Sequence, residues 1–115
     1  MRAEGCAYRT PEGLGYRVIA ARDGLDRPRP HDTVTLRMSG WSHDGDALPM
    51  PASPTRFRVS SLIPGFVHGL GLMTVGERWM LCIPEELAYQ GRPGSPGGML
   101  VFDVELLAID RALER

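Results

Sequence analysis

The chain has 115 residues and a net charge of −1, with 43% apolar and 23% charged residues. This length allows one domain with a single modest core, and the composition is typical of an ordinary soluble globular protein. The arginines are scattered, which argues against nucleic acid or an anionic membrane surface as a partner.

No targeting or membrane-spanning segment is recognisable in the sequence. No run of about 18 apolar residues could cross a membrane, and residues 1–13 lack the apolar run of a secretory signal. We therefore expect a cytoplasmic location, unless the chain was trimmed from a longer exported precursor. Cys6 and Cys82 lack the spacing of a metal site. We expect no obligatory disulfide between them, with Cys82 as a buried or half-buried thiol.

The N-terminal third of the chain predicts strands separated by turns. Residues 1–12 carry no periodicity, and we expect this N-terminus to be frayed or disordered. Apolar side chains then alternate with their neighbours over residues 14–20 and, more cleanly, from Thr33 to Ser39. This period of two is typical of a half-buried strand. Asp44-Gly45 predicts a tight turn after the second strand.

A proline-rich stretch precedes the third predicted strand. Pro49, Pro51 and Pro54 have no N–H to donate, so this stretch is expected to form an edge or a bulge rather than a central strand. From Thr55 to Val59 apolar and charged side chains alternate again, which predicts a strand.

The periodicity changes between residues 63 and 71. Ile63, Phe66, Val67 and Leu70 fall at positions i, i+3, i+4 and i+7, which form one face of a helix. Pro64 suits the first helical position, where its missing N–H would have no partner. A helix of about two turns is unstable alone, so it must pack on a sheet.

Two more alternating segments, 78–83 and 100–107, complete the predicted elements. The connections are short, and none has the length of a crossover between parallel strands. The pattern predicts an α+β fold in which an antiparallel sheet of five or six strands curls over one short helix.

The chain lacks the common motifs of nucleophilic, phosphate-binding or metal-dependent enzymes. His31, His43 and His68 lie on separate segments, and we expect them to be surface residues rather than metal ligands. Glu85 and Glu86 are adjacent carboxylates of the kind usually found solvated. No residue is an obvious nucleophile.

The segment from Gly76 to Asp110, GERWMLCIPEELAYQGRPGSPGGMLVFDVELLAID, resembles the C-terminal half of FKBP-type peptidyl-prolyl cis-trans isomerases. Ile83 to Tyr89 corresponds to the run that ends in the tyrosine of the substrate pocket, and Leu100 to Leu107 to the closing strand. The resemblance extends upstream to about Gly13, so it implies a single FKBP-like domain over 13–115. It also implies a twisted half-barrel sheet around one helix, of the bacterial, short-loop type.

The resemblance implies which residues form the site. Tyr89, Ile63 and Phe66 match the catalytic positions: the tyrosine hydroxyl, a backbone N–H that binds the substrate, and the aromatic floor. The matching substrate-binding positions are Met38, Leu48, Phe57, Leu62 and Phe102. Without the resemblance, most of these apolar residues would simply be assigned to the core, whereas for Tyr89 a binding role and a structural role both stay open.

The sequence departs from the family pattern at several positions of this site. Met38-Ser39-Gly40 replaces tyrosine-threonine-glycine, and Leu48-Pro49 replaces phenylalanine-aspartate. The loop Gly91 to Gly98 is short and lacks bulky aliphatic residues. The site is therefore expected to be apolar but to lack the acidic group of the family.

We expect a peptidyl-prolyl isomerase without cofactor that acts on proline-containing peptides or unfolded proteins. A macrolide ligand is not expected to bind well, and the protein is expected to be a monomer. The alternative is a catalytically weak or inactive FKBP-like module that binds proline-containing or apolar segments, which the Leu48-Pro49 pair favours. A third interpretation is a scaffold with Trp41 at an interface.

Overall fold

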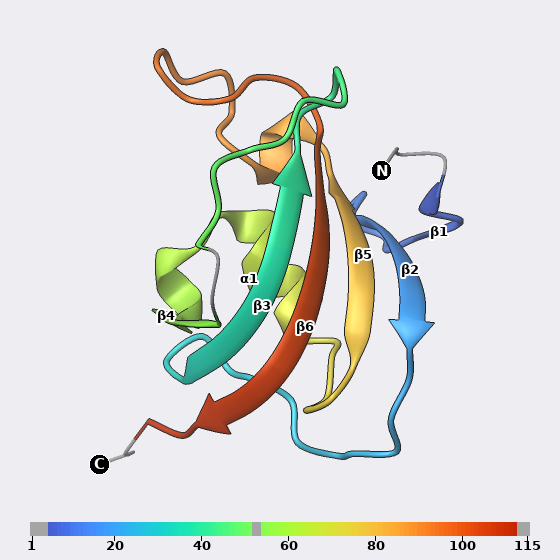
Figure 1. Cartoon of the computed structure of the whole chain (residues 1–115), viewed down its shortest axis with the longest axis vertical. Coiled ribbons are helices and arrows are strands. Elements are labelled where there is room, and N and C mark those ends of the chain that lie inside the picture. Colours follow the sequence, from blue (N-terminus) through green and yellow to red (C-terminus); the bar gives the residue numbers. More distant parts are fainter. Residues whose placement is uncertain (1–4, 52–53, 113–115) are drawn as a thin grey trace.

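The computed structural model describes residues 5–51 and 54–112. Its strands form one sheet in the order β1-β2-β5-β6-β3-β4, and every neighbouring pair is antiparallel (Figure 1). The strands are β1 (Tyr8–Arg9), β2 (Gly15–Ala20), β3 (Thr33–Trp41), β4 (Thr55–Arg58), β5 (Arg78–Ile83) and β6 (Leu100–Asp110). The helical elements are α1 (Pro64–Leu70) and the short 3₁₀ turns η2 (Val59–Ser61) and η3 (Glu85–Leu87). The predicted antiparallel sheet with one short helix is confirmed.

The longest strand, β6, lies between β5 and β3 and forms the centre of the sheet. Phe102 of β6 pairs with Leu81 on one side and with Gly40 on the other. Its side chain therefore lies in the middle of the sheet, on the face that α1 covers (Figure 1). A register shift between Thr35 and Leu36 interrupts the β3–β6 ladder, and such a bulge increases the local twist.

The helix α1 begins after Ile63 with Pro64 at its first turn and ends at Leu70, as the periodicity predicts. Phe66 and Leu70 are buried beneath the sheet. Two glycines let the helix approach β5 closely. A Cβ atom on Gly65 would lie 2.4 Å from Cγ2 of Ile83, and one on Gly69 would lie 2.9 Å from Cδ1 of Leu81. Because Ile83 and Leu81 are fully buried, neither can move aside easily.

This packing predicts opposite effects for two Gly→Ala substitutions. Overpacking at Gly65 costs about 1–3 kcal/mol, which exceeds the gain of about 1 kcal/mol in helix propensity. At Gly71, just after the helix, a Cβ atom would meet only ordinary contacts at 3.4 Å or more. Urea unfolding should therefore show Gly65→Ala to be less stable than wild type and Gly71→Ala to be equally or slightly more stable. Equal stabilities of the two variants would contradict the close packing.

The N-terminal segment differs from the expected frayed terminus from Gly5 onward, while residues 1–4 lie outside the described part. Tyr8–Arg9 pair with β2 as an edge strand. The ring of Tyr8 stacks on Tyr16 at 5.7 Å between centroids, and Tyr16 in turn stacks on Trp79 at 5.1 Å. A strand of two residues is too short to display a period, so sequence periodicity could not reveal it.

Cys6 and Cys82 form a disulfide, so the expectation of unlinked thiols is wrong. The bond joins the N-terminal segment to β5 on the outer face of the sheet, away from α1. There Met80, Cys82 and Val101 form a second small cluster with Cys6, Trp41 and Met99. Trp41 therefore packs within this cluster. The two cysteines are 76 positions apart in the sequence, and such a spacing carries no signal of pairing.

We predict that the disulfide contributes substantially to stability. A cross-link that closes so long a loop restricts the unfolded chain, and removal of such a bond typically costs about 2–4 kcal/mol. The denaturant concentration at the unfolding midpoint of the wild type should decrease when reductant is added. The double variant Cys6→Ala/Cys82→Ala should show the lower midpoint with or without reductant. Identical curves for the oxidised and reduced wild type would contradict the prediction.

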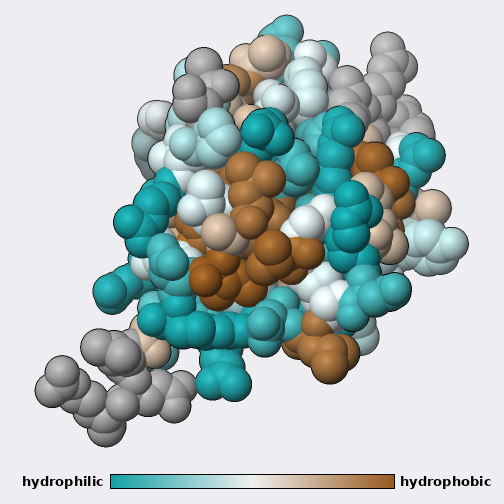
Figure 2. All heavy atoms as spheres, turned by 60° about the horizontal axis from the view of Figure 1, so that its bottom comes forward, coloured by the Kyte–Doolittle hydropathy of each residue, from teal (hydrophilic) through white to brown (hydrophobic). Residues whose placement is uncertain are grey.

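Exposed apolar side chains gather at the end of the molecule opposite the loop that follows η3. Figure 2 brings this end forward and shows a hydrophobic patch framed by hydrophilic side chains. The exposed large apolar residues here include Leu72 and Val75, in the turn before β5, and Leu25, which is 89% exposed. Nε of Arg27 donates to the Leu72 carbonyl oxygen at 3.3 Å and links the two loops. Among the described residues, no helix combines the length and apolar character needed to cross a membrane.

Candidate functional site

Every residue that the sequence predicts for the site lies in or against one hydrophobic cluster, the main core. Phe66 and Phe102 belong to its buried part, whereas Met38, Leu48, Phe57, Leu62, Ile63 and Tyr89 are half-buried and pack against it. These residues come from three strands, the helix and three connections, so only the folded chain brings them together. We refer to this set as the candidate site.

Two phenylalanines form the floor of the candidate site. The ring centroids of Phe66, from α1, and Phe102, from β6, are 4.7 Å apart with an interplanar angle of 66°. This edge-to-face arrangement is favourable for aromatic pairs. Gly40 makes room for it, because a Cβ atom there would lie 2.7 Å from the Phe102 ring and 3.1 Å from Cε of Met50. The floor therefore requires a glycine in β3.

The half-buried side chains form an apolar rim around this floor. Met38 comes from β3, Phe57 from β4, and Leu62 is the residue that follows η2. A hollow of about 410 Å³ borders Met38, Leu48 and Met50 at one side of the rim. Met50 and Leu87 also pack against the main core, and the sequence analysis missed both. They lie in a proline-rich stretch and a 3₁₀ turn, where no period identifies buried positions.

The backbone N–H of Ile63 has no acceptor among the described residues. Ile63 is the N-cap of α1, with φ −60° and ψ 153°. Its carbonyl oxygen accepts the N–H groups of Phe66 at 2.9 Å and Val67 at 3.2 Å. Residues at the start of a helix leave their own N–H groups without an intrahelical partner. This N–H is therefore available to an external acceptor.

Tyr89 is held by the turns that follow β5. The Ala88 N–H donates to the Glu85 carbonyl oxygen at 3.0 Å, and the Arg92 N–H donates to the Tyr89 carbonyl oxygen at 3.0 Å. Gln90 adopts a left-handed conformation with φ 56°, which is unfavourable for a residue other than glycine. The Tyr89 side chain is half-buried against the main core, and within the described residues no hydrogen bond satisfies its hydroxyl.

The loop that carries Tyr89 is closed by one side-chain hydrogen bond. Oε2 of Glu85 accepts the Gly98 N–H at 2.6 Å. Gly98 has φ 71°, and a Cβ atom on it would lie 2.7 Å from Cδ2 of His43. The loop before β6 therefore packs against the turn after β3, at the edge of the candidate site.

We predict that Glu85→Ala loosens this loop. Loss of one hydrogen bond costs about 1 kcal/mol, which corresponds to a roughly fivefold rise in local opening. Amide hydrogen exchange at Gly98, followed by NMR, should accelerate by this factor. Glu86→Ala is the matched control, because Glu86 is equally exposed and its carboxylate does not bind Gly98. Equal exchange rates at Gly98 in the two variants would contradict the role of Glu85.

The departures from the family pattern leave the rim apolar. The Leu48 N–H donates to the Gly40 carbonyl oxygen at 2.8 Å, and the Leu48 side chain packs against the main core. Pro49 is exposed. The candidate site itself contains no carboxylate, and in the described part of the chain no group of three or more histidine, cysteine or acidic side chains could hold a metal ion.

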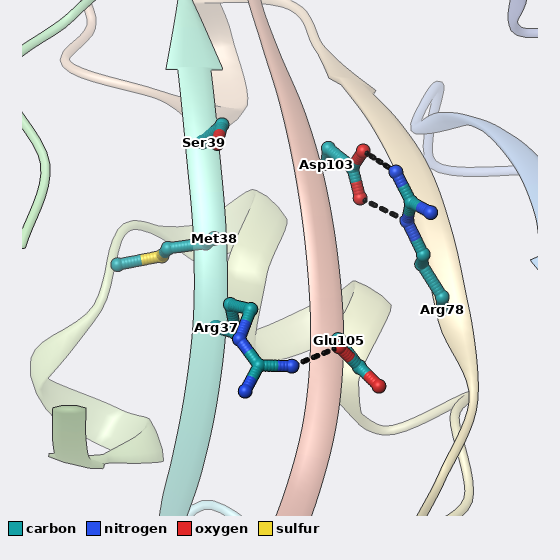
Figure 3. A pocket seen from close by; sticks show the side chains of 6 residues that line it. All are labelled: Arg37, Met38, Ser39, Arg78, Asp103 and Glu105. Carbon is teal, nitrogen blue, oxygen red and sulfur yellow. Dashed lines mark hydrogen bonds and ion pairs between the residues drawn. The ribbon is translucent and has the colours of Figure 1, made fainter. Parts of the chain in front are cut away.

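A second hollow of about 340 Å³ lies on the outer face of β3, β6 and β5, the face opposite α1 (Figure 3). Two ion pairs line it. Nη1 of Arg37 contacts Oε1 of Glu105 at 2.8 Å, and Arg78 binds Asp103 through two nitrogens. The hydrogen bonds to Asp103 raise the pKa of the Arg78 guanidinium above its ordinary value. Because each of these four charges is already paired, the hollow is a weaker candidate than the apolar site.

Comparison with known proteins agrees with this geometry. The family of FKBP-type peptidyl-prolyl cis-trans isomerases matches residues 24–107. The outer membrane protein MIP of Legionella longbeachae is 36% identical in an alignment of 109 positions that covers 89% of this chain and 46% of that protein. The FKBP-type 22 kDa peptidyl-prolyl cis-trans isomerase of Escherichia coli (strain K12) is 38% identical in an alignment of 127 positions that covers 95% of this chain and 61% of that protein.

Among solved structures, the crystal structure of FkpA from Escherichia coli is similar with a TM-score of 0.83 and 38% identity, over 92% of this chain and 52% of that one. The antiparallel sheet and the helix α1 thus define an FKBP-like fold. The chain belongs to the family of FKBP-type peptidyl-prolyl cis-trans isomerases. It spans about half the length of the curated relatives it matches, at 46% and 61% of the two named here.

Proposed function

We propose that the protein is a peptidyl-prolyl cis-trans isomerase that acts, without cofactor, on X–Pro bonds of peptides or unfolded proteins. One observation carries the proposal. An apolar rim surrounds an edge-to-face aromatic floor. Two donors that have no partner among the described residues, the Ile63 N–H and the Tyr89 hydroxyl, belong to the same cluster. Family membership supports the same activity.

The chemistry needs no nucleophile. Rotation about an amide bond has a barrier of about 18–20 kcal/mol because resonance gives the C–N bond double-bond character. Water that hydrogen-bonds the amide oxygen strengthens this resonance. The half-buried side chains of Met38, Leu48 and Phe57 offer the amide an environment with little water, so the twisted state, which has lost the resonance, becomes less unfavourable relative to the planar one.

In this proposal each predicted residue has a separate task. Phe66 and Phe102 support the proline ring as the floor. The Ile63 N–H donates to a carbonyl oxygen of the substrate backbone and fixes its position. The Tyr89 hydroxyl donates to the substrate as a second fixed donor, which favours the charge distribution of the twisted amide. Met38, Leu48, Phe57 and Leu62 exclude water around the bond.

The direct test is the rate of cis-to-trans isomerisation of a peptide containing Phe-Pro. Micromolar protein should accelerate the uncatalysed reaction, which takes tens to hundreds of seconds. Absence of acceleration would contradict the proposal. Peptide titration followed by tryptophan fluorescence would then separate the alternative, a module that binds proline-containing segments without catalysis, from a scaffold that binds none.

Tyr89→Phe should lower kcat/KM by about 2- to 10-fold, because it removes one hydrogen bond worth about 0.5–1.5 kcal/mol. Tyr8→Phe is the matched control: it removes a hydroxyl from an exposed tyrosine of β1 outside the candidate site and should leave the rate unchanged. Phe66→Ala should lower activity further, provided that circular dichroism shows a folded protein, since Phe66 is also buried in the core. Full activity in Tyr89→Phe would mean that the phenol has no role.

We further infer that macrolides bind weakly, since Met38 and Pro49 stand where the family has a tyrosine and an aspartate. The Cys6–Cys82 disulfide supports an exported protein, because disulfides persist mainly in oxidising compartments. This agrees with a relative named as an outer membrane protein. We therefore propose that the protein is exported to an oxidising compartment and does not reside in the cytoplasm.

A further inference from the structure

A third hollow, which we call the outer groove, lies beside α1 and has a volume of about 450 Å³. Its apolar surface comes from Leu62, Val67 and Leu87, all half-buried and packed against the main core. Glu12, Ser60 and His68 contribute polar groups to it. The groove is thus an apolar depression with a polar edge, of a kind suited to one or two apolar side chains of a bound chain.

The outer groove and the candidate site share the same two walls. One wall is the segment from Leu62 to Val67, in which Ile63 and Phe66 belong to the candidate site and Leu62 and Val67 line the groove. The other wall carries Leu87, which lies two residues before Tyr89. Leu62 belongs to both. The outer groove therefore adjoins the candidate site at Leu62.

The polar edge of the groove contains the side chains of Glu12 and His68. Nε2 of His68 lies 3.0 Å from Oε2 of Glu12. The pKa of the Glu12 carboxyl is lowered, chiefly by a hydrogen bond from its own backbone N–H and further by Thr10 and His68, so this group is negatively charged at neutral pH. No arginine lines the groove. The edge therefore disfavours an acidic side chain, while the floor favours an apolar one.

We propose that the outer groove is a second binding subsite for the substrate, which accepts an apolar side chain that flanks the proline. This inference rests on the proposed function, since it names a preference of the same binding surface. Burial of part of an apolar side chain in the groove contributes about 1 kcal/mol, which corresponds to a roughly fivefold difference in kcat/KM.

The test compares three kinds of peptide on one protein. The first is a short Phe-Pro tetrapeptide. The others carry the same core extended at its N-terminal or C-terminal end by two leucines or by two aspartates. For the wild type, the leucine extension at one end should raise kcat/KM roughly fivefold over the aspartate extension. Val67→Glu and, separately, Leu87→Asn should bring this leucine-to-aspartate ratio close to one.

Because the leucine-to-aspartate ratio of kcat/KM is taken on one variant, it cancels any effect of the substitution on catalysis of the Phe-Pro core that both peptides share. Val75→Glu is the matched control, because it places the same charge in the exposed turn before β5, at a residue that does not line the groove, and should preserve the wild-type ratio. A wild type that does not accelerate the tetrapeptide overturns the proposed function. A wild type that accelerates it, but with ratios unaffected by Val67→Glu and Leu87→Asn in folded protein, overturns the groove alone.

Discussion

The contact between Phe66 and Phe102 is the interaction on which the rest of the structure depends. A helix of seven residues is unstable by itself, and Phe66 attaches it to the central strand β6 at 4.7 Å between ring centroids. Gly65 and Gly69 bring the helix close enough to β5 for this contact. Since β6 pairs with both β5 and β3, the same pair of rings joins the helix to the middle of the sheet.

The floor of the candidate site is consequently part of the core. Substitutions there alter stability and binding together, which limits how far the floor can vary. Part of the rim is different, because Leu48, Met50 and Tyr89 lie in connections between strands, where replacements disturb less packing. One departure from the family pattern falls on this part: an apolar leucine and an exposed proline replace the family's phenylalanine-aspartate pair. Differences in rate or ligand preference among relatives can therefore arise without any change in the floor.

Local periodicity predicted the elements that contain enough residues to show a period. The strands around Val34, Leu81 and Val104 alternate clearly, and the helix face that contains Phe66 has its own spacing. The sequence could not reveal β1, which has two residues, or the bond between Cys6 and Cys82, which depends on how the distant segments fold together. Met50 and Leu87 were missed because an irregular segment has no alternation to expose its buried positions. The resemblance to the family supplied the residues of the site, and the fold placed them in one cluster; their individual roles stay predictions.

The disulfide also divides the chain in a way that the strand order does not suggest. The covalent ring closed by Cys6 and Cys82 contains β1 to β4, α1 and nearly all of β5, whereas the loop with Tyr89 and the whole of β6 lie outside it. A force applied to the two chain ends could therefore extend little more than the part after Cys82, with the ring remaining closed. Because β6 lies between two strands that begin inside the ring, its withdrawal would be the main mechanical event and would remove Phe102 from the floor of the candidate site.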